Sequence, residues 1–430
     1  MEYIPVIVLV LSFLVLLLMG VPVAWSIGIS SLLTMLVSIS AGPSFTTVAQ
    51  RIATGLDSFA LLAIPFFILS GQLMNKGGIA IRLINFAKTL VGSLPGGLAH
   101  INVIAAMLMG AIAGSAMAAA SSMGSILGPQ MEKEGYSKEF GAAVNITSAT
   151  TGLVIPPSNV LIVYSLASGG VSIAALFLAG YIPGVLTGLF LMIVAGIWAK
   201  RKKYPIAARS NFKEVITTFI SAFPSLLLLV VVIGGIVAGI FTATEASAVA
   251  VLYTLVLGFW YREIKWKDLP QILLSSVETT AIVMLLIGTS MSMSWVMSFE
   301  NIPQDVSAAL LSISDNKIVV LLLINLILLF VGVFMDMTPA VLIFTPIFLP
   351  VVTKLGLDPV HFGIIMVLNL CVGLCTPPVG SVLFVGVGIA NTTIEKVIKP
   401  LLPLFVAMII ALFLVTYIPE LSLWLPSLFE

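Results

Sequence analysis

The sequence predicts an all-α integral membrane protein with about ten full spans and two re-entrant hairpins. Its 430 residues are 60% hydrophobic and only 9% charged, whereas soluble domains carry about 25% charged residues. Apolar runs near or above the roughly 20 residues that cross a bilayer recur along the whole chain. Because no stretch between them is long enough for a separate soluble domain, the protein is expected to act in or near a membrane.

The spans are identified by apolar length and by the loop residues that separate them. Full spans are expected near residues 3–20, 21–39, 58–75, 139–168, 171–199, 215–240, 242–260, 271–298, 361–389 and 398–418. Two further apolar segments, 97–130 and 317–353, are interrupted at their centres by GSAMAAASS and MDMTP. Each of these two segments is therefore expected to form a hairpin that enters and leaves the membrane on one side.

Basic residues indicate the orientation, because Lys and Arg favour cytoplasmic loops. The strongest cluster is AKRKKYPIAARSNFK, at residues 199–213. If this loop is cytoplasmic, counting spans in both directions puts 16 of the 19 basic residues inside and leaves only Arg51, Lys317 and Lys354 outside. Both termini are then expected outside.

A shift of 221 residues aligns the two halves of the chain. It lays a set of matching residues on one another: Asp57 on Glu278, Ser93 on Ser314, Pro129 on Pro350, Gly135 on Gly356, Gly152 on Gly373, and Pro156 and Pro157 on Pro377 and Pro378. Each half holds five spans and one hairpin. Because five is an odd number of crossings, the second half is expected to have the opposite orientation in the membrane to the first. Inverted repeats with broken helices are typical of secondary transporters.

This organisation divides the chain into three expected parts. Residues 1–200 form the first inverted repeat, with the hairpin 97–130 and a broken helix at 139–168. Residues 201–214 are a cytoplasmic linker, and residues 215–430 form the second repeat, with the hairpin 317–353 and a broken helix at 361–389.

The two broken helices carry adjacent prolines in TTGLVIPPSN and VGLCTPPVGS. Proline removes a helical hydrogen bond and clashes with the preceding turn, and irregular backbone survives inside a membrane only where protein buries it or it lines a wet cavity. At such breaks, free carbonyls can hold a cation and half-helix N-termini can hold an anion. The breaks are therefore expected to meet the hairpin tips at a central site.

Asp336 is the clearest candidate residue of that site. It lies in FVGVFMDMTPAVLIF, far from any loop charge, and intramembrane carboxylates are costly unless they are paired or bind an ion. The alternative is a protonated Asp336 bonded to nearby backbone. Thr338 and Thr376 offer hydroxyl oxygens, and with neither His nearby such an oxygen-rich site suits Na+ better than a transition metal.

The serines near the first break have two interpretations each. Ser115 occupies the apparent turn of the first hairpin and is a candidate ligand, whereas Ser121 and Ser122 are equally well explained by close helix packing through small residues. Ser158 and Asn159 can reach a substrate or cap the following half-helix. Glu245, in the short turn GIFTATEAS, is expected to have a structural capping role.

Several function classes are excluded by missing motifs. The chain has no H-E-x-x-H zinc helix and no G-x-x-x-x-G-K-[ST] nucleotide loop. A proton-pumping subunit would need a string of buried Lys, Glu and His residues, whereas here the polarity is concentrated at two hairpin tips and two breaks. Cys371 and Cys375 lie in an apolar stretch and are expected to pack rather than react. The pattern favours an ion-coupled carrier over an enzyme, with no cofactor other than the coupling ion.

Five stretches together resemble a known family. GAIAGSAMAAASSMGSILGP, TTGLVIPPSN, GIFTATEASAVAVLY, MDMTPAVLIFTPIFLPV and GLCTPPVG look like the large membrane subunit (DctM/SiaM-like) of tripartite ATP-independent periplasmic (TRAP) transporters. The resemblance covers essentially the whole chain. One departure is Ala243, where the family often has Pro, and it touches only a turn.

The resemblance implies a Na+-driven importer of organic acids in a bacterial inner membrane, which works by an elevator motion with the hairpins in the moving unit. Na+ would bind between the first hairpin and the first break, and between the second hairpin and the second break. By the family's pattern these sites comprise Gly114, Ser115, Gly152 and Pro156, and Gly332, Asp336, Thr338, Gly373 and Thr376. Substrate would lie between them, near Ser115, Ser158 and Asn159.

The resemblance also implies two partners, a small four-span membrane subunit on a separate chain and a periplasmic substrate-binding protein. Both termini would then be periplasmic. Sialic acid is the best guess for the substrate, and C4-dicarboxylates and sugar acids are the alternatives. A self-sufficient Na+/dicarboxylate symporter built on the same repeat is a further alternative.

Overall fold

The computed structural model describes residues 4–206 and 211–429, which fold into α-helices and short 3₁₀ helices with no strand among them. The first half contains α1 (Ile4–Leu18), α2 (Val23–Ser38), α3 (Ala41–Gly55), α4 (Ala63–Lys76), α5 (Ile79–Val91), α6 (Gly97–Ala113), α7 (Ala116–Lys133), α8 (Lys138–Thr151), α9 (Asn159–Ala167) and α10 (Ile173–Lys202). The second half contains α11 (Phe212–Val237), α12 (Ala243–Trp260), α13 (Leu269–Phe299), α14 (Ile302–Ile313), α15 (Lys317–Phe334), α16 (Met337–Lys354), α17 (Pro359–Leu374), α18 (Ser381–Ile389), α19 (Ile394–Tyr417) and α20 (Glu420–Leu423). The 3₁₀ helices are Phe59–Leu62, Trp266–Asp268 and Pro426–Leu428.

Eight helical stretches of the described residues are long and apolar enough to cross a membrane. They comprise α10, α11, α12, α15, α16 and α19, together with α4 and α13 extended by their preceding 3₁₀ turns. Helices α1, α2 and α17 and most of α6 are apolar but shorter. The protein is therefore an all-helical, multi-span membrane protein, as the composition predicted.

Three helices occupy segments in which the sequence predicts no span and no hairpin. These are α3, α5 and α14, of 15, 13 and 12 residues. They are too short to span a bilayer alone and contain polar residues among their apolar ones, so their sequences lack the long apolar run that indicates a span.

The expected spans 139–168 and 361–389 are each divided into two helices. α8 ends at Thr151 and α9 begins at Asn159, while α17 ends at Leu374 and α18 begins at Ser381. The prolines lie between the two helices in each case, and the Pro156–Pro157 and Pro377–Pro378 peptide bonds are both cis. The first break is buried throughout, whereas Pro378 and Val379 of the second are exposed.

Helix boundaries recur at the offset found in the sequence. α7 and α16 begin and end 221 residues apart, and α17 and α19 begin 221 residues after α8 and α10. The halves differ elsewhere, because α3 and α4 are separated by a 3₁₀ turn whereas α13 runs unbroken for 31 residues. The expected linker 201–214 runs from the end of α10 to the start of α11, and its residues 207–210, including Arg209, lie outside the described residues.

Helices α8 and α17 form the centre of the molecule. α8 is buried from Phe140 to Thr151 and α17 from His361 to Leu374. The two helices touch, since the Cys371 Sγ donates to the Thr150 carbonyl oxygen at 3.1 Å. Both cysteines are buried free thiols, so the packing role expected for them is confirmed.

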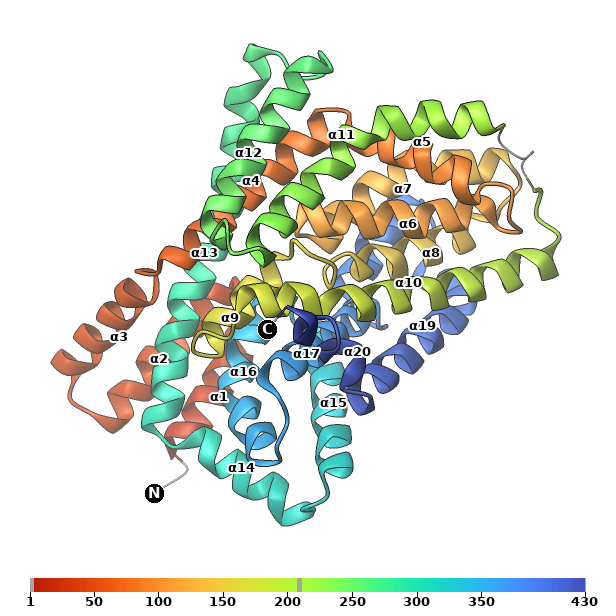
Figure 1. The fold of residues 1–430 in the computed structure, drawn as a ribbon. Helices are drawn as coiled ribbons and strands as arrows, with labels where there is room; N and C mark the ends of the chain where they lie inside the picture. The colour runs from red at the N-terminus through yellow and green to blue at the C-terminus, as the bar shows by residue number, and fades with distance from the viewer. Residues whose placement is uncertain (1–3, 207–210, 430) are drawn as a thin grey trace.

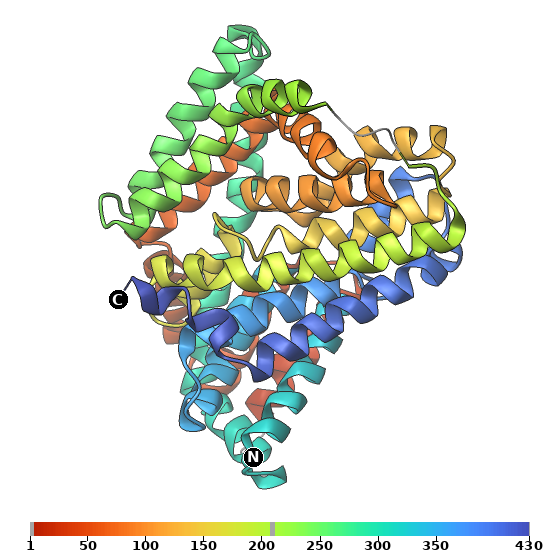
Figure 2. The same cartoon turned by 45° about the vertical axis from the view of Figure 1, so that its right-hand side comes forward.

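The long helices α10 and α19 contact each other and cross the molecule side by side (Figures 1 and 2). In Figure 2, α5 and α6 lie above them and α15 and α16 lie below. α4 packs on α12, and α13 contacts α2, α3, α4 and α16. α12 begins with a capping box in which Thr242 and Glu245 bond each other's backbone N–H groups, so the structural role expected for Glu245 is confirmed.

Candidate functional site

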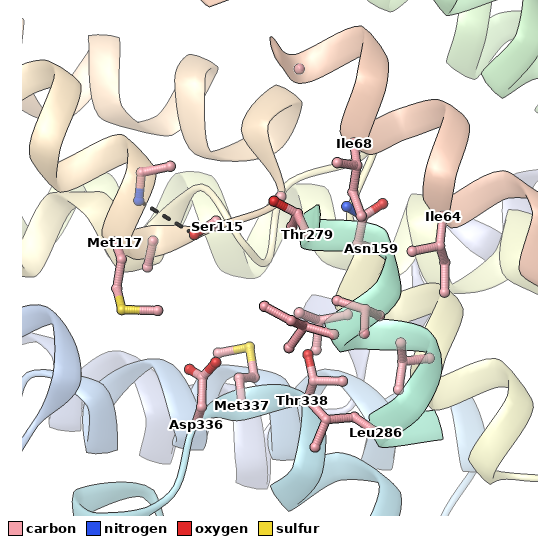
Figure 3. Close-up of a pocket in the computed structure, with 18 of the residues that line it drawn as sticks. Ile64, Ile68, Ser115, Met117, Asn159, Thr279, Leu286, Asp336, Met337 and Thr338 are labelled. Carbon is pink, nitrogen blue, oxygen red and sulfur yellow. Dashed lines mark hydrogen bonds between the residues drawn. The ribbon is translucent and has the colours of Figure 1, made fainter. Parts of the chain in front are cut away.

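A cavity of about 310 Å³ lies where the two hairpin tips approach each other (Figure 3). α6 and α7 form the first hairpin and α15 and α16 form the second. The cavity lining comes from the two tips, from the half-helices α9 and α18, from the end of α17, and from α4 and α13. It comprises Ile64, Ile68, Gly71, Gln72, Asn75, Gly114, Ser115, Ala116, Met117, Ala118, Asn159, Val160, Val163, Thr279, Ile282, Val283, Leu286, Asp336, Met337, Thr338, Leu374 and Val382.

The first hairpin tip is built by Gly114 and Ser115. Gly114 ends α6 with φ of 61°, a left-handed conformation that side chains with a Cβ disfavour. A Cβ at this position would lie 2.3 Å from the Asn159 amide nitrogen, so that amide packs directly on the glycine. Ser115 is the N-cap of α7, where its Oγ accepts a hydrogen bond from the Ala118 N–H at 3.3 Å.

The second tip places a carboxylate where the first has a hydroxyl. Asp336 is the N-cap residue of α16, but its side chain makes no capping hydrogen bond. The carboxylate is instead exposed and lines the cavity together with Met337 and Thr338. Figure 3 shows Ser115 and Asn159 on one side of the cavity and Asp336 and Thr338 on the other.

Four helix N-termini face this cavity. The first turns of α7, α9, α16 and α18 contribute Ala116, Asn159, Met337 and Val382 to the lining. Unpaired N–H groups and the helix dipole give each N-terminus a partial positive charge, which favours a bound anion.

Asp336 is the one charged residue among the cavity lining in the described part of the chain, and no Lys, Arg or His accompanies it there. An anion in this cavity would therefore meet helix N-termini, amides and hydroxyls rather than a basic side chain. A cation would meet the carboxylate of Asp336.

Five of the predicted site residues line the cavity, and the other six do not. Gly114, Ser115, Asn159, Asp336 and Thr338 line it, whereas Gly152, Pro156, Ser158, Gly332, Gly373 and Thr376 do not. Among these, the Ser158 hydroxyl donates to the Leu153 carbonyl within the first break, and the Thr376 hydroxyl donates to the Val372 carbonyl at 2.8 Å.

The predicted glycines lie where each hairpin touches its break. A Cβ on Gly152 would lie 2.4 Å from the Gly110 Cα, and a Cβ on Gly373 would lie 2.6 Å from the Gly332 Cα. These contacts bring backbone of α6 and α15 against the two breaks, where helix ends leave carbonyl groups without helical partners.

The oxygen donors around the tips are ligands that hard cations prefer. Carbonyl and hydroxyl oxygens predominate, with the single carboxylate of Asp336. No group of three or more His, Cys, Asp or Glu side chains able to hold a metal occurs among residues 4–206 and 211–429. Such donors suit a hard cation rather than a softer transition metal.

Three polar residues of the cavity were not predicted. Gln72 and Asn75 lie three residues apart near the end of α4, and Thr279 lies on α13. The i, i+3 spacing of Gln72 and Asn75 within an apolar span was the available signal, since it puts both on one helical face.

Comparison with known proteins identifies one family. Residues 10–421 match the sequence profile of the family described as "Tripartite ATP-independent periplasmic transporter, DctM component".

Similar proteins cover nearly the full length of the chain. The "Uncharacterized protein YgiK" of Salmonella typhimurium is 57% identical, over 100% of this chain and 99% of the relative. The "C4-dicarboxylate TRAP transporter large permease protein DctM" of Rhodobacter capsulatus is 39% identical, over 96% and 97%. The "Sialic acid TRAP transporter large permease protein SiaM" of Vibrio cholerae is also 39% identical, over 98% of each.

One solved structure shares the fold at low sequence identity. The YdaH transporter of Alcanivorax borkumensis superposes with a TM-score of 0.65 over 89% of this chain and 88% of that chain, at 13% identity. At this identity the likeness concerns the fold alone.

Proposed function

The chain belongs to the family of DctM components of tripartite ATP-independent periplasmic transporters, and on that premise we propose that it imports an organic acid together with Na+ as the large permease subunit. It is a transporter permease and not an enzyme. The observation that carries the proposal is the cavity between the two hairpin tips, which combines four helix N-termini with one carboxylate that caps no helix.

In this proposal Na+ binds at both hairpins. The first ion lies near Gly114, Ser115, Gly152 and Pro156, and the second near Gly332, Asp336, Thr338, Gly373 and Thr376. The close backbone contacts of Gly110 with Gly152 and of Gly332 with Gly373 support these positions, because they bring the carbonyl-rich breaks against the hairpins. The substrate carboxylate lies between the ions, near Ser115, Asn159 and the buried Ser158.

An elevator motion of two inverted repeats is the proposed mechanism. α7 of the first hairpin packs on α18, and α16 of the second packs on α9. The hairpin of each half therefore packs on the broken helix of the other half. This arrangement supports two interlocked repeats, at 1–200 and 215–430, joined by a linker at 201–214. The hairpins and broken helices would move as one unit past a scaffold that includes α4 and α13.

The proposed partners are those of the family, a small four-span membrane subunit and a periplasmic substrate-binding protein. The proposed location is a bacterial inner membrane with both termini in the periplasm, which follows from the distribution of Lys and Arg between loops.

Sialic acid is the proposed substrate, and C4-dicarboxylates and sugar acids are the competing candidates. The relative named for sialic acid and the relative named for C4-dicarboxylates are equally similar to this chain. Overall identity therefore favours neither, and a direct measurement must choose.

The test is uptake of labelled sialic acid into proteoliposomes that contain this chain and its small-subunit partner. Uptake that needs both an inward Na+ gradient and the binding protein is the expected result. Uptake without the binding protein would instead establish a self-sufficient symporter. If no sialic acid enters, C4-dicarboxylates and sugar acids are assayed in the same vesicles, and failure of all three would overturn the proposal.

A further inference from the structure

The cavity has a second wall, formed by α4 and α13, whose polarity changes along its length. Ile64 and Ile68 of α4 and Val283 and Leu286 of α13 make one part apolar. Gln72, Asn75 and Thr279 make the other part polar and are called here the polar strip. Figure 3 shows Thr279 reaching from α13 into the cavity beside Ser115 and Asn159.

The polar strip keeps free hydrogen-bonding capacity: the Thr279 hydroxyl donates to the Ser275 carbonyl at 3.0 Å but its oxygen can still accept a hydrogen bond. The Asn75 Oδ1 is buried and has no hydrogen-bond partner. Thr279 is exposed to the cavity and Gln72 is half-buried beside it. A buried acceptor without a partner is costly, so a rotation of the Asn75 amide that turns Oδ1 toward a hydrogen-bond donor in the cavity would be favourable.

We propose that Gln72, Asn75 and Thr279 select the substrate by binding its uncharged polar groups while its carboxylate faces the hairpin tips. This inference rests on the proposed transport function and assigns part of the selectivity to the scaffold rather than to the moving unit. Amides and a hydroxyl both donate and accept hydrogen bonds. They therefore match hydroxyl or amide groups on the far end of an organic acid.

The same chemistry disfavours a second carboxylate at the far end. The described cavity lining offers no Lys, Arg or His that could neutralise it, and a charge buried without a partner is strongly disfavoured. The polar strip thus favours hydroxylated monocarboxylic acids over unsubstituted dicarboxylic acids. Sites that hydrogen-bond a substrate hydroxyl reject analogues that lack it.

The selectivity depends on the position of the moving unit. The polar strip lies in the second half of α4 and the first half of α13. Because these helices belong to the proposed scaffold, a substrate that travels with the hairpins meets the strip only at the position seen in this structure. At the other end of the movement it would no longer contact the polar strip.

The first test compares a hydroxylated monocarboxylic sugar acid with succinate as uptake substrates in proteoliposomes containing the partners and a Na+ gradient. Thr279→Val and Gln72→Leu should raise the KM for the sugar acid about three- to tenfold, the usual effect of losing one uncharged hydrogen bond. The KM for succinate should change less than the KM for the sugar acid, and a Tm equal to that of the wild type shows that the variants are folded. Thr280→Val is the matched control, because Thr280 does not line the cavity.

The outcomes separate the two proposals. If the wild type moves no organic acid with Na+, the transport proposal fails and the polar strip fails with it. If the wild type transports acids but prefers succinate, or if the variants keep the wild-type selectivity within about twofold, only the polar strip is overturned.

A second test does not depend on transport. Cys371 and Cys375 are buried, so a polar maleimide should report mainly on an introduced thiol. At about twice its Kd or more, the sugar acid should slow the labelling of Thr279→Cys by at least about threefold, because only the ligand-free fraction exposes the thiol, and it should leave the labelling of Thr280→Cys unchanged. Equal labelling of Thr279→Cys with and without the sugar acid would contradict the proposal.

Discussion

Ser115 and Asp336 occupy equivalent positions, 221 residues apart, as the N-cap residues of α7 and α16. The hydroxyl of Ser115 caps its helix, whereas the carboxylate of Asp336 leaves its own helix uncapped and faces the cavity. A duplicated position has thus acquired a charge in one half only. We infer that the two proposed Na+ sites differ in strength, and that the second depends on a formal negative charge.

Replacement of Asp336 tests this inference. Asp336→Asn should raise the Na+ concentration for half-maximal uptake about tenfold or more, because unit charges a few ångströms apart in a partly screened site attract by a few kcal/mol. The measurement is initial uptake rate against Na+ concentration. Asp305→Asn, an exposed carboxylate on α14 away from the cavity, is the control. An unchanged Na+ response would remove Asp336 from the site.

Gly114 should resist substitution for two reasons. An alanine there would hold φ of 61° and place its Cβ against the Asn159 amide, and the left-handed conformation alone costs about 1–2 kcal/mol. Gly114→Ala should therefore lower the Tm of the purified protein and reduce uptake. Gly128→Ala on the same hairpin, where a Cβ would meet nothing within 4 Å, should leave the Tm equal or higher. Equal Tm values for the two variants would contradict this account.

The hairpin and the broken helix of each half are paired elements, and the contact between them is made by glycine. Gly110 packs against Gly152 and Gly332 packs against Gly373, and in each pair the backbone atoms are in direct contact. Neither partner of a pair can carry a side chain without separating the elements. The hairpin and its break are therefore expected to move together.

Gly152→Ala is the test of that pairing. Its Cβ would lie 2.8 Å from the Ala106 carbonyl oxygen as well as against Gly110, and overpacking of this kind typically costs about 1–3 kcal/mol. The Tm should fall, and Na+ should stabilise the variant less than the wild type. Gly388→Ala, in the open part of α18, provides the comparison. A Na+-induced Tm shift equal to that of the wild type would argue against coupling between the break and the ion.

At the scale of the elements, the sequence predicted those features that depend on local composition. Long apolar helices and the two tips at Ser115 and Asp336 were visible because apolar length and polar interruption are local signals. α3, α5 and α14 were missed, since short helices are stabilised mainly by the helices they pack against. Gln72 and Thr279 were missed because their role depends on where α4 and α13 lie relative to the tips.

At the scale of the whole molecule, the proposed stoichiometry makes transport sensitive to membrane voltage. Carrying one carboxylate into a negative interior costs about 2.3 kcal/mol per 100 mV, and two Na+ ions contribute about twice that in the favourable direction. Uptake of a monocarboxylic acid should therefore accelerate when valinomycin and a K+ gradient make the vesicle interior negative. An unchanged rate at equal Na+ gradient would exclude net positive charge movement.

If the hairpins move along α13 as proposed, the uninterrupted length of this helix limits how far they can travel. Its 31 residues extend about 46 Å at 1.5 Å per residue, and the cavity touches it only from Thr279 to Leu286. The thirteen positions from Leu286 to Phe299 leave roughly 20 Å of helix for a hairpin to travel along. Spin labels on Ser298→Cys and Thr353→Cys, both exposed positions, should change their separation by less than that length when Na+ and substrate are added. A larger change would mean that the hairpin moves past the end of α13. The length of α13 beyond the cavity is therefore an upper limit with which the measured movement can be compared.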